Sequence, residues 1–91
     1  MKETIEFRGN EYIIKYRHER ILDDCGNPEN RGGATIAYIV LKYDDKGRAY
    51  SVIDAVAICN KSDAYDKKLG RKIARGRLEK VIETLEDMSP M

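Results

Sequence analysis

ATIAYIVLKYDDKGRAYSVIDAVAIC, residues 34–59, is the stretch that decides the fold. Residues 34–43 and 48–59 are rich in β-branched and aromatic side chains, which favour strands. Asp44-Asp45-Lys46-Gly47 lies between them and predicts a four-residue turn, with Gly47 where a left-handed residue is needed. Neither run alternates cleanly between apolar and polar positions, so both faces of this hairpin are expected to be at least partly buried.

The flanking residues supply a second hairpin and a helix. TIEF (4–7) and EYIIKY (11–16) flank Arg8-Gly9-Asn10 and predict a tight hairpin. Residues 62–87 follow a helical period, with Ser62 or Asp63 as the expected N-cap. The sequence therefore predicts an α+β fold, β-β-β-β-α, in which one C-terminal amphipathic helix packs on one face of a four-stranded antiparallel sheet. We expect one domain, 1–91: hairpin 1–17, loop 18–33, hairpin 34–59 and helix 62–87.

The expected helix contains two glycines, Gly70 and Gly76, each followed by arginine. Glycine inside a helix costs roughly 1 kcal/mol relative to alanine, so each should have a reason. The expected apolar stripe starts at Leu69 and Ile73 and continues through Ala74, Leu78, Val81, Ile82 and Leu85. Gly76 and Ala74 lie beside the line from Leu69 and Ile73 to Val81, so we expect these small residues to let the helix approach the sheet. Gly70 lies among basic residues, so we interpret it as a close-approach glycine that opens the surface to a ligand or partner.

One helix leaves the second face of the sheet uncovered. Because the central strands are apolar on both faces, that face should be shielded by the loop 18–33 or by a second copy of the protein. We therefore expect a homodimer or a higher homo-oligomer.

Charge is distributed unevenly in a chain of 91 residues whose net charge is only +1. Residues 61–80 hold eight basic and three acidic side chains. A basic stripe of this kind predicts a surface for an anionic ligand or partner: nucleic acid, a nucleotide or an acidic protein. A solvated helix face is the alternative interpretation. The candidate binding residues are Lys67, Lys68, Arg71, Lys72, Arg75 and Arg77.

The sequence predicts no active site. His18 is the only histidine, and it reads as a solvated loop residue. Cys59 and Ser62 stand in no nucleophile motif, and a buried, inert thiol is the favoured interpretation of Cys59. Cys25 and Cys59 have no metal-ligand spacing, so we expect no catalytic residue, metal or cofactor. Free thiols are favoured over a disulfide, which stays open.

The expected environment is the cytoplasm. The longest apolar run falls far short of the roughly 20 residues that a membrane span needs, and the N-terminus lacks the apolar region of a signal peptide. No membrane partner is expected.

The segment from Gly32-Gly33-Ala34-Thr35 through Cys59 to Arg77-Leu78 resembles a group of small bacteriophage proteins. They share a strand rich in Val and Ala that ends near a cysteine, followed by a helix with the pattern Asp-x-aromatic-x-x-Lys-x-Gly-Arg-x-Ile-Ala-x-Gly-Arg. This chain matches the pattern with Asp63-Ala64-Tyr65, Lys68, Gly70-Arg71, Ile73-Ala74 and Gly76-Arg77. The resemblance covers about half the chain and implies a counter-defence protein in the host cytoplasm. Such a protein would bind a CRISPR–Cas effector or sequester a nucleotide signal. A small nucleic-acid-binding regulator and a module that docks on an acidic protein stay open as alternatives.

Overall fold

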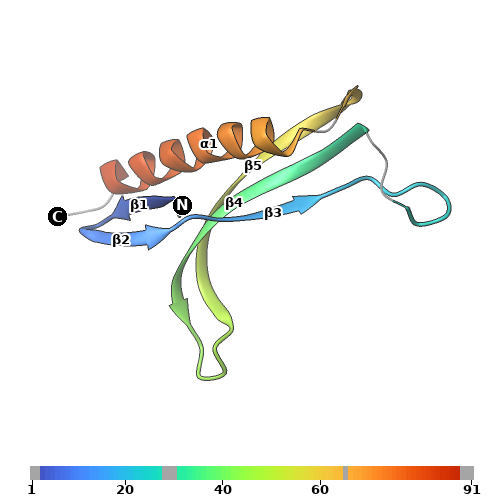
Figure 1. Cartoon of the computed structure of the whole chain (residues 1–91). Helices are drawn as coiled ribbons and strands as arrows, with labels where there is room; N and C mark the ends of the chain where they lie inside the picture. The colour runs from blue at the N-terminus through green and yellow to red at the C-terminus, as the bar shows by residue number, and fades with distance from the viewer. Residues whose placement is uncertain (1–2, 28–30, 65, 89–91) are drawn as a thin grey trace.

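The computed structural model describes residues 3–27, 31–64 and 66–88. Five antiparallel strands precede one helix (Figure 1). The predicted α+β class and the single C-terminal helix are confirmed, but the predicted four-stranded sheet is wrong. The strands form two sheets, β1-β2 and β3-β4-β5. Their bounds are β1 Thr4–Phe7, β2 Asn10–Ile13, β3 Lys15–Glu19, β4 Arg31–Tyr43 and β5 Ala49–Ala64, and the helix α1 is Lys67–Met88.

Ile14 divides the predicted strand 11–16 into β2 and β3. Its side chain is buried, and its backbone N–H donates to the carbonyl of Glu3 at 2.9 Å. β2 pairs with β1 across a turn in which Arg8 and Gly9 both have positive φ, as the favoured two-residue hairpin requires. β3 leaves that hairpin and pairs with β4 instead. Because β3 continues to Glu19, the predicted loop 18–33 begins later than expected.

The predicted 34–59 hairpin is present and longer than expected. The turn at 44–47 is confirmed: Asp44 accepts hydrogen bonds from the backbone N–H groups of Lys46 and Arg48, and Gly47 has φ 79°. β5 continues to Ala64, so the predicted N-cap at Ser62 or Asp63 is wrong. Asp66 caps α1 instead, because its carboxylate accepts from the backbone N–H of both Lys68 and Leu69.

The main core lies between α1 and one face of the three-stranded sheet. Ala74, Leu78 and Ile82 form the buried stripe of the helix. They pack in one cluster with small and branched side chains of β4 and β5, and with residues from the first hairpin and its junction: Ala37, Ile39, Ala55, Ala57, Phe7 and Ile14. The predicted apolar stripe is wrong at its start, where Leu69 and Ile73 are exposed. The helix therefore packs through a narrower face than the sequence suggested.

Candidate anion-binding surface

The start of α1 is held very close to β4 at Gly70. A Cβ atom added to Gly70 would overlap Thr35 Oγ1 and lie 3.1 Å from Thr35 Cβ. Thr35 is completely buried, so it has little room to move. Glycine is thus needed here for packing against the sheet, and our interpretation that Gly70 opens the surface to a ligand is wrong.

Gly76 has the opposite environment. It is exposed, and an added Cβ would meet no heavy atom within 4 Å. The expectation that Gly76 lets the helix approach the sheet is therefore wrong as well. The packing role predicted for Gly76 belongs to Gly70, because the helix faces the sheet through Ala74, Leu78 and Ile82 and leaves Leu69 and Ile73 exposed.

His18 lies beside the Gly70–Thr35 contact rather than in a solvated loop. It belongs to β3, it is half-buried, and its Nδ1 lies 3.0 Å from Thr35 Oγ1. Burial lowers the pKa of His18, and the nearby charges of Lys67 and Arg71 lower that pKa further.

Arg75 is neutralised within the molecule. Its guanidinium bonds the Glu3 carboxylate at 2.5 Å and the Glu79 carboxylate at 3.0 Å. The hydrogen bond from Arg75 lowers the pKa of Glu3, while burial and the Glu3 carboxylate raise the pKa of Tyr16 to about 12. Arg75 thus ties the N-terminal segment to the helix, a contact between residues 72 positions apart.

Four of the predicted binding residues line one shallow depression, of about 420 Å³, on α1. On one side of this depression lies Arg75, whose charge is neutralised by its two carboxylate partners. Lys68, Arg71 and Lys72 form its cationic side, and none of the three is ion-paired with a carboxylate whose position the structure describes. Lys67 is exposed nearby and adds to the same field at His18. We call Lys67, Lys68, Arg71 and Lys72 the cationic surface.

Arg77 lies apart from this surface. Its guanidinium donates to the backbone carbonyl of Val56 at 2.8 Å, on the edge strand β5. Arg77 therefore covers an edge carbonyl, as charged side chains do on many exposed sheet edges. The sequence placed Arg77 with the other basic residues because it could not show which side of the helix meets β5.

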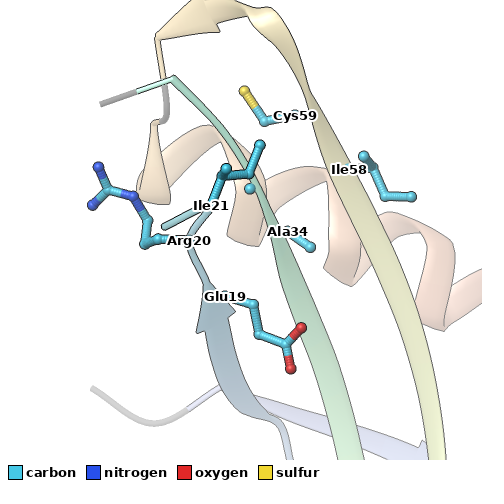
Figure 2. Close-up of a pocket in the computed structure, with 7 residues that line it drawn as sticks. Glu19, Arg20, Ile21, Ala34, Ile58 and Cys59 are labelled. Atoms are coloured by element: carbon cyan, nitrogen blue, oxygen red, sulfur yellow. The ribbon is translucent and has the colours of Figure 1, made fainter. Parts of the chain in front are cut away.

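A second depression, of about 590 Å³, opens beside the end of β3, the start of β4 and the second half of β5 (Figure 2). Glu19 and Arg20 bring opposite charges to it, and Cys59 brings a thiol. Cys59 is half-buried rather than buried as expected, and its Sγ lies 3.7 Å from the Ala64 carbonyl. Cys25 and Cys59 are not joined in a disulfide. The lining is Glu19, Arg20, Ile21, Gly33, Ala34, Ile58 and Cys59.

Neither depression holds a recognisable catalytic or metal-binding arrangement. Among the residues that the structure describes, no three His, Cys, Asp or Glu side chains gather closely enough to hold a metal ion. The only histidine bonds Thr35 in the interior and does not line the depression that contains Cys59. Within the same described ranges, α1 is too polar to cross a membrane.

Fold and site together define an α+β protein that presents a cationic helix surface on an antiparallel sheet. Comparisons with protein-family models, curated proteins and solved structures gave no significant match.

Proposed function

We propose that this protein is a non-enzymatic binding protein that holds an anionic partner on its cationic surface. In line with the resemblance of its helix, the proposed role is that of a phage-type accessory protein. It would inhibit a host defence system by binding one of its components, a Cas effector or a nucleotide signal, in the host cytoplasm.

The proposal rests on one observation, namely which basic side chains of α1 are ion-paired within the molecule and which are not. Arg75 is bonded to two carboxylates, whereas Lys68, Arg71 and Lys72 have no described ion-pair partner. Lysine and arginine that stay available beside a concave surface attract phosphate or carboxylate groups and raise the rate of association with them.

A nucleic-acid-binding regulator is the second candidate. The same cationic surface supports it, because phosphate contacts supply most sequence-independent affinity for nucleic acids. Salt dependence separates the two candidates. A protein that neutralises several phosphates loses affinity linearly in log salt, with a slope of about −0.7 to −0.9 per contact, whereas a small nucleotide gives a much shallower slope.

The proposal is tested by expression in bacteria that carry single defence systems, followed by phage challenge. We expect the wild-type protein to restore plaque formation against at least one system, and Lys68→Gln/Lys72→Gln to fail. The matched control is Lys42→Gln/Lys46→Gln, which removes two exposed lysines near the 44–47 turn and should still restore plaques.

Two further measurements make the outcome decisive. Because the substituted lysines are exposed, we expect both double variants to fold, and circular dichroism must confirm that they do. Native mass spectrometry of the purified protein reports any co-purifying nucleotide. Equal activity of the two double variants would refute the role of the cationic surface, and failure of the wild-type protein against every defence system would refute the counter-defence role.

A further inference from the structure

The outer face of the three-stranded sheet, the one opposite α1, carries exposed apolar side chains on β5 beside the charged side chains Lys15, Arg17 and Glu19 of β3. Alternate residues of β5 point to this face, and four of them expose large fractions of apolar side chains: Tyr50 74%, Val52 48%, Val56 37% and Ile58 78%. β4 adds Tyr38 and Val40, both half-buried, beside them. Monomeric proteins rarely expose so continuous an apolar strip, and such strips mark interaction surfaces.

The described part of the loop after β3 does not cover this face. Its described residues 20–27 close on themselves, because Asp23 bonds the backbone of both Cys25 and Asn27. Leu22 is 60% exposed rather than packed on the sheet. In Figure 1 the loop projects beyond the ends of the strands. The sequence left two candidates for covering this face, the loop 18–33 and a second copy of the protein. The second copy is therefore the better candidate.

The surface area indicates the size of the missing contact. The chain exposes 7005 Å², whereas a folded monomer of this mass is expected to expose about 5400 Å². The radius of gyration is 15.3 Å, against about 12 Å for a compact domain of this length. A standard interface removes about 800 Å² from each partner. The excess is large enough for one such interface.

The charges on the outer face complement one another across a two-fold axis. The strand register places Lys15 of β3, Tyr38 of β4 and Asp54 of β5 on one rung of the sheet. If a second copy stacks face to face, with the two-fold axis parallel to β4, β3 of each copy lies over β5 of the other. Lys15 then meets Asp54 of the second copy, twice, while Tyr38 lies near the axis.

The side chain of Lys15 is already held near this face. Its Nζ donates to Tyr43 Oη at 3.2 Å and lies 5.7 Å from the centre of the Tyr43 ring. An ammonium group has two further donors, so this bond leaves Lys15 able to pair with a carboxylate. The acid on this part of β5 is Asp54, and it is exposed.

We propose that the outer face of β3-β4-β5 is the interface of a homodimer in which two sheets stack face to face about a two-fold axis parallel to β4. The apolar side chains of β4 and β5 form the centre of the interface, and the Lys15–Asp54 pairs set its orientation. Aligned sheet packing of this kind joins the inner faces of β-sandwiches at a spacing of about 10 Å. The cationic surface lies on the opposite layer and stays free for its own partner.

A nucleic acid is a weaker candidate for the same face. Tyr38, Tyr43 and Tyr50 could stack bases, as sheet aromatics do in RNA-binding domains. Lys15 and Arg17 of β3 would attract phosphates, but Asp54 within the apolar strip and Glu19 at its border would repel them. In the proposed dimer, by contrast, the Asp54 carboxylate pairs with Lys15 of the second copy. The observations therefore favour a second copy over a nucleic acid.

The test is the oligomeric state in solution, measured by analytical ultracentrifugation over a range of micromolar concentrations. The wild-type protein should be a dimer. Ile58→Glu should weaken dimerisation by at least about tenfold, because it buries a charge in the interface. Ile58 is exposed in the protomer, so the variant should fold. Leu69→Glu is the matched control: Leu69 is exposed on α1, away from the outer face, and its variant should stay dimeric.

A charge exchange tests the orientation. Lys15→Asp alone and Asp54→Lys alone should each weaken the dimer, and the double variant should regain most of the affinity. Several results would overturn the proposal: a monomeric wild-type protein, an Ile58→Glu dimer as tight as wild type, or loss of the dimer in Leu69→Glu. It would also fail if a single-stranded oligonucleotide bound the wild-type monomer and Tyr38→Ala abolished that binding.

The dimer proposal and the proposed function can be refuted separately. Lys68→Gln/Lys72→Gln should remain dimeric, because both lysines lie on the helix layer. If this double variant becomes monomeric, α1 rather than the sheet carries the interface, which also overturns the proposal.

Discussion

Replacing Gly70 by alanine should destabilise the protein even though alanine is the better helix former. Alanine gains roughly 1 kcal/mol over glycine inside a helix. Its Cβ would overlap Thr35 Oγ1, which cannot turn away easily because Thr35 is completely buried, is branched at Cβ and lies against His18. Overpacking at such a site typically costs about 1–3 kcal/mol. We expect a net loss of up to about 2 kcal/mol.

Gly76→Ala is the matched control. The same substitution in the same helix meets open space, so only the helix preference acts, and stability should rise by about 0.5–1 kcal/mol. Urea unfolding followed by circular dichroism measures both variants. The midpoint of Gly70→Ala should fall and that of Gly76→Ala should rise, with unchanged slopes.

A double-mutant cycle identifies the cause. Thr35→Ala removes the atom that the new methyl group would strike, so it should reduce or reverse the penalty of Gly70→Ala, with a coupling of about 1 kcal/mol or more. The reasoning is refuted if Gly70→Ala raises stability as Gly76→Ala does. Additive effects of Thr35→Ala and Gly70→Ala would refute the assignment of the strain to Thr35.

Two further predictions concern the core and the buried imidazole. Leu78→Ala should cost about 3–5 kcal/mol in urea unfolding, because Leu78 is fully buried in the centre of the helix interface, whereas Leu69→Ala should cost less than about 1 kcal/mol. The pKa of His18 is lower in the folded protein than in the unfolded chain, so the unfolded chain takes up the proton first as the pH falls. Wild-type stability should therefore decrease as the pH falls below about 6.5, the model-peptide value, and this part of the decrease should be absent in His18→Gln. An equal pH dependence in the two proteins between pH 7.5 and 5.5 would contradict the environment described for His18.

The sequence predicted those features that depend on local pattern. The 44–47 turn, the hairpin that it closes and the C-terminal helix all follow from residue types and spacing. The helix period also placed Lys68, Arg71, Lys72 and Arg75 on one side, and the structure confirms that these four line one depression.

Features that depend on tertiary contacts were missed. The break at Ile14 depends on a hydrogen bond to Glu3, and the pairing of Glu3 with Arg75 joins distant segments without a sequence signal. The exposure of Leu69 and Ile73 was also missed, because the sequence does not show where the start of the apolar stripe loses contact with β4 and β5, although Ala74 and Leu78 of the same stripe are buried. One usable signal was present: Ile14, Tyr16 and His18 alternate, which could have extended the strand through His18.

The position of Gly70 changes how a binding defect should be read. The sequence suggested that loss of binding in Gly70→Ala would place a ligand at that glycine. In the structure Gly70 packs against Thr35, and Arg71 follows it directly onto the cationic surface. A methyl group at Gly70 would push the start of α1 away from β4 and move Arg71 and Lys72 with it. Loss of binding in Gly70→Ala is therefore expected from displacement alone. Lys72→Gln, which leaves the helix contact intact, is the substitution that reports directly on the binding surface.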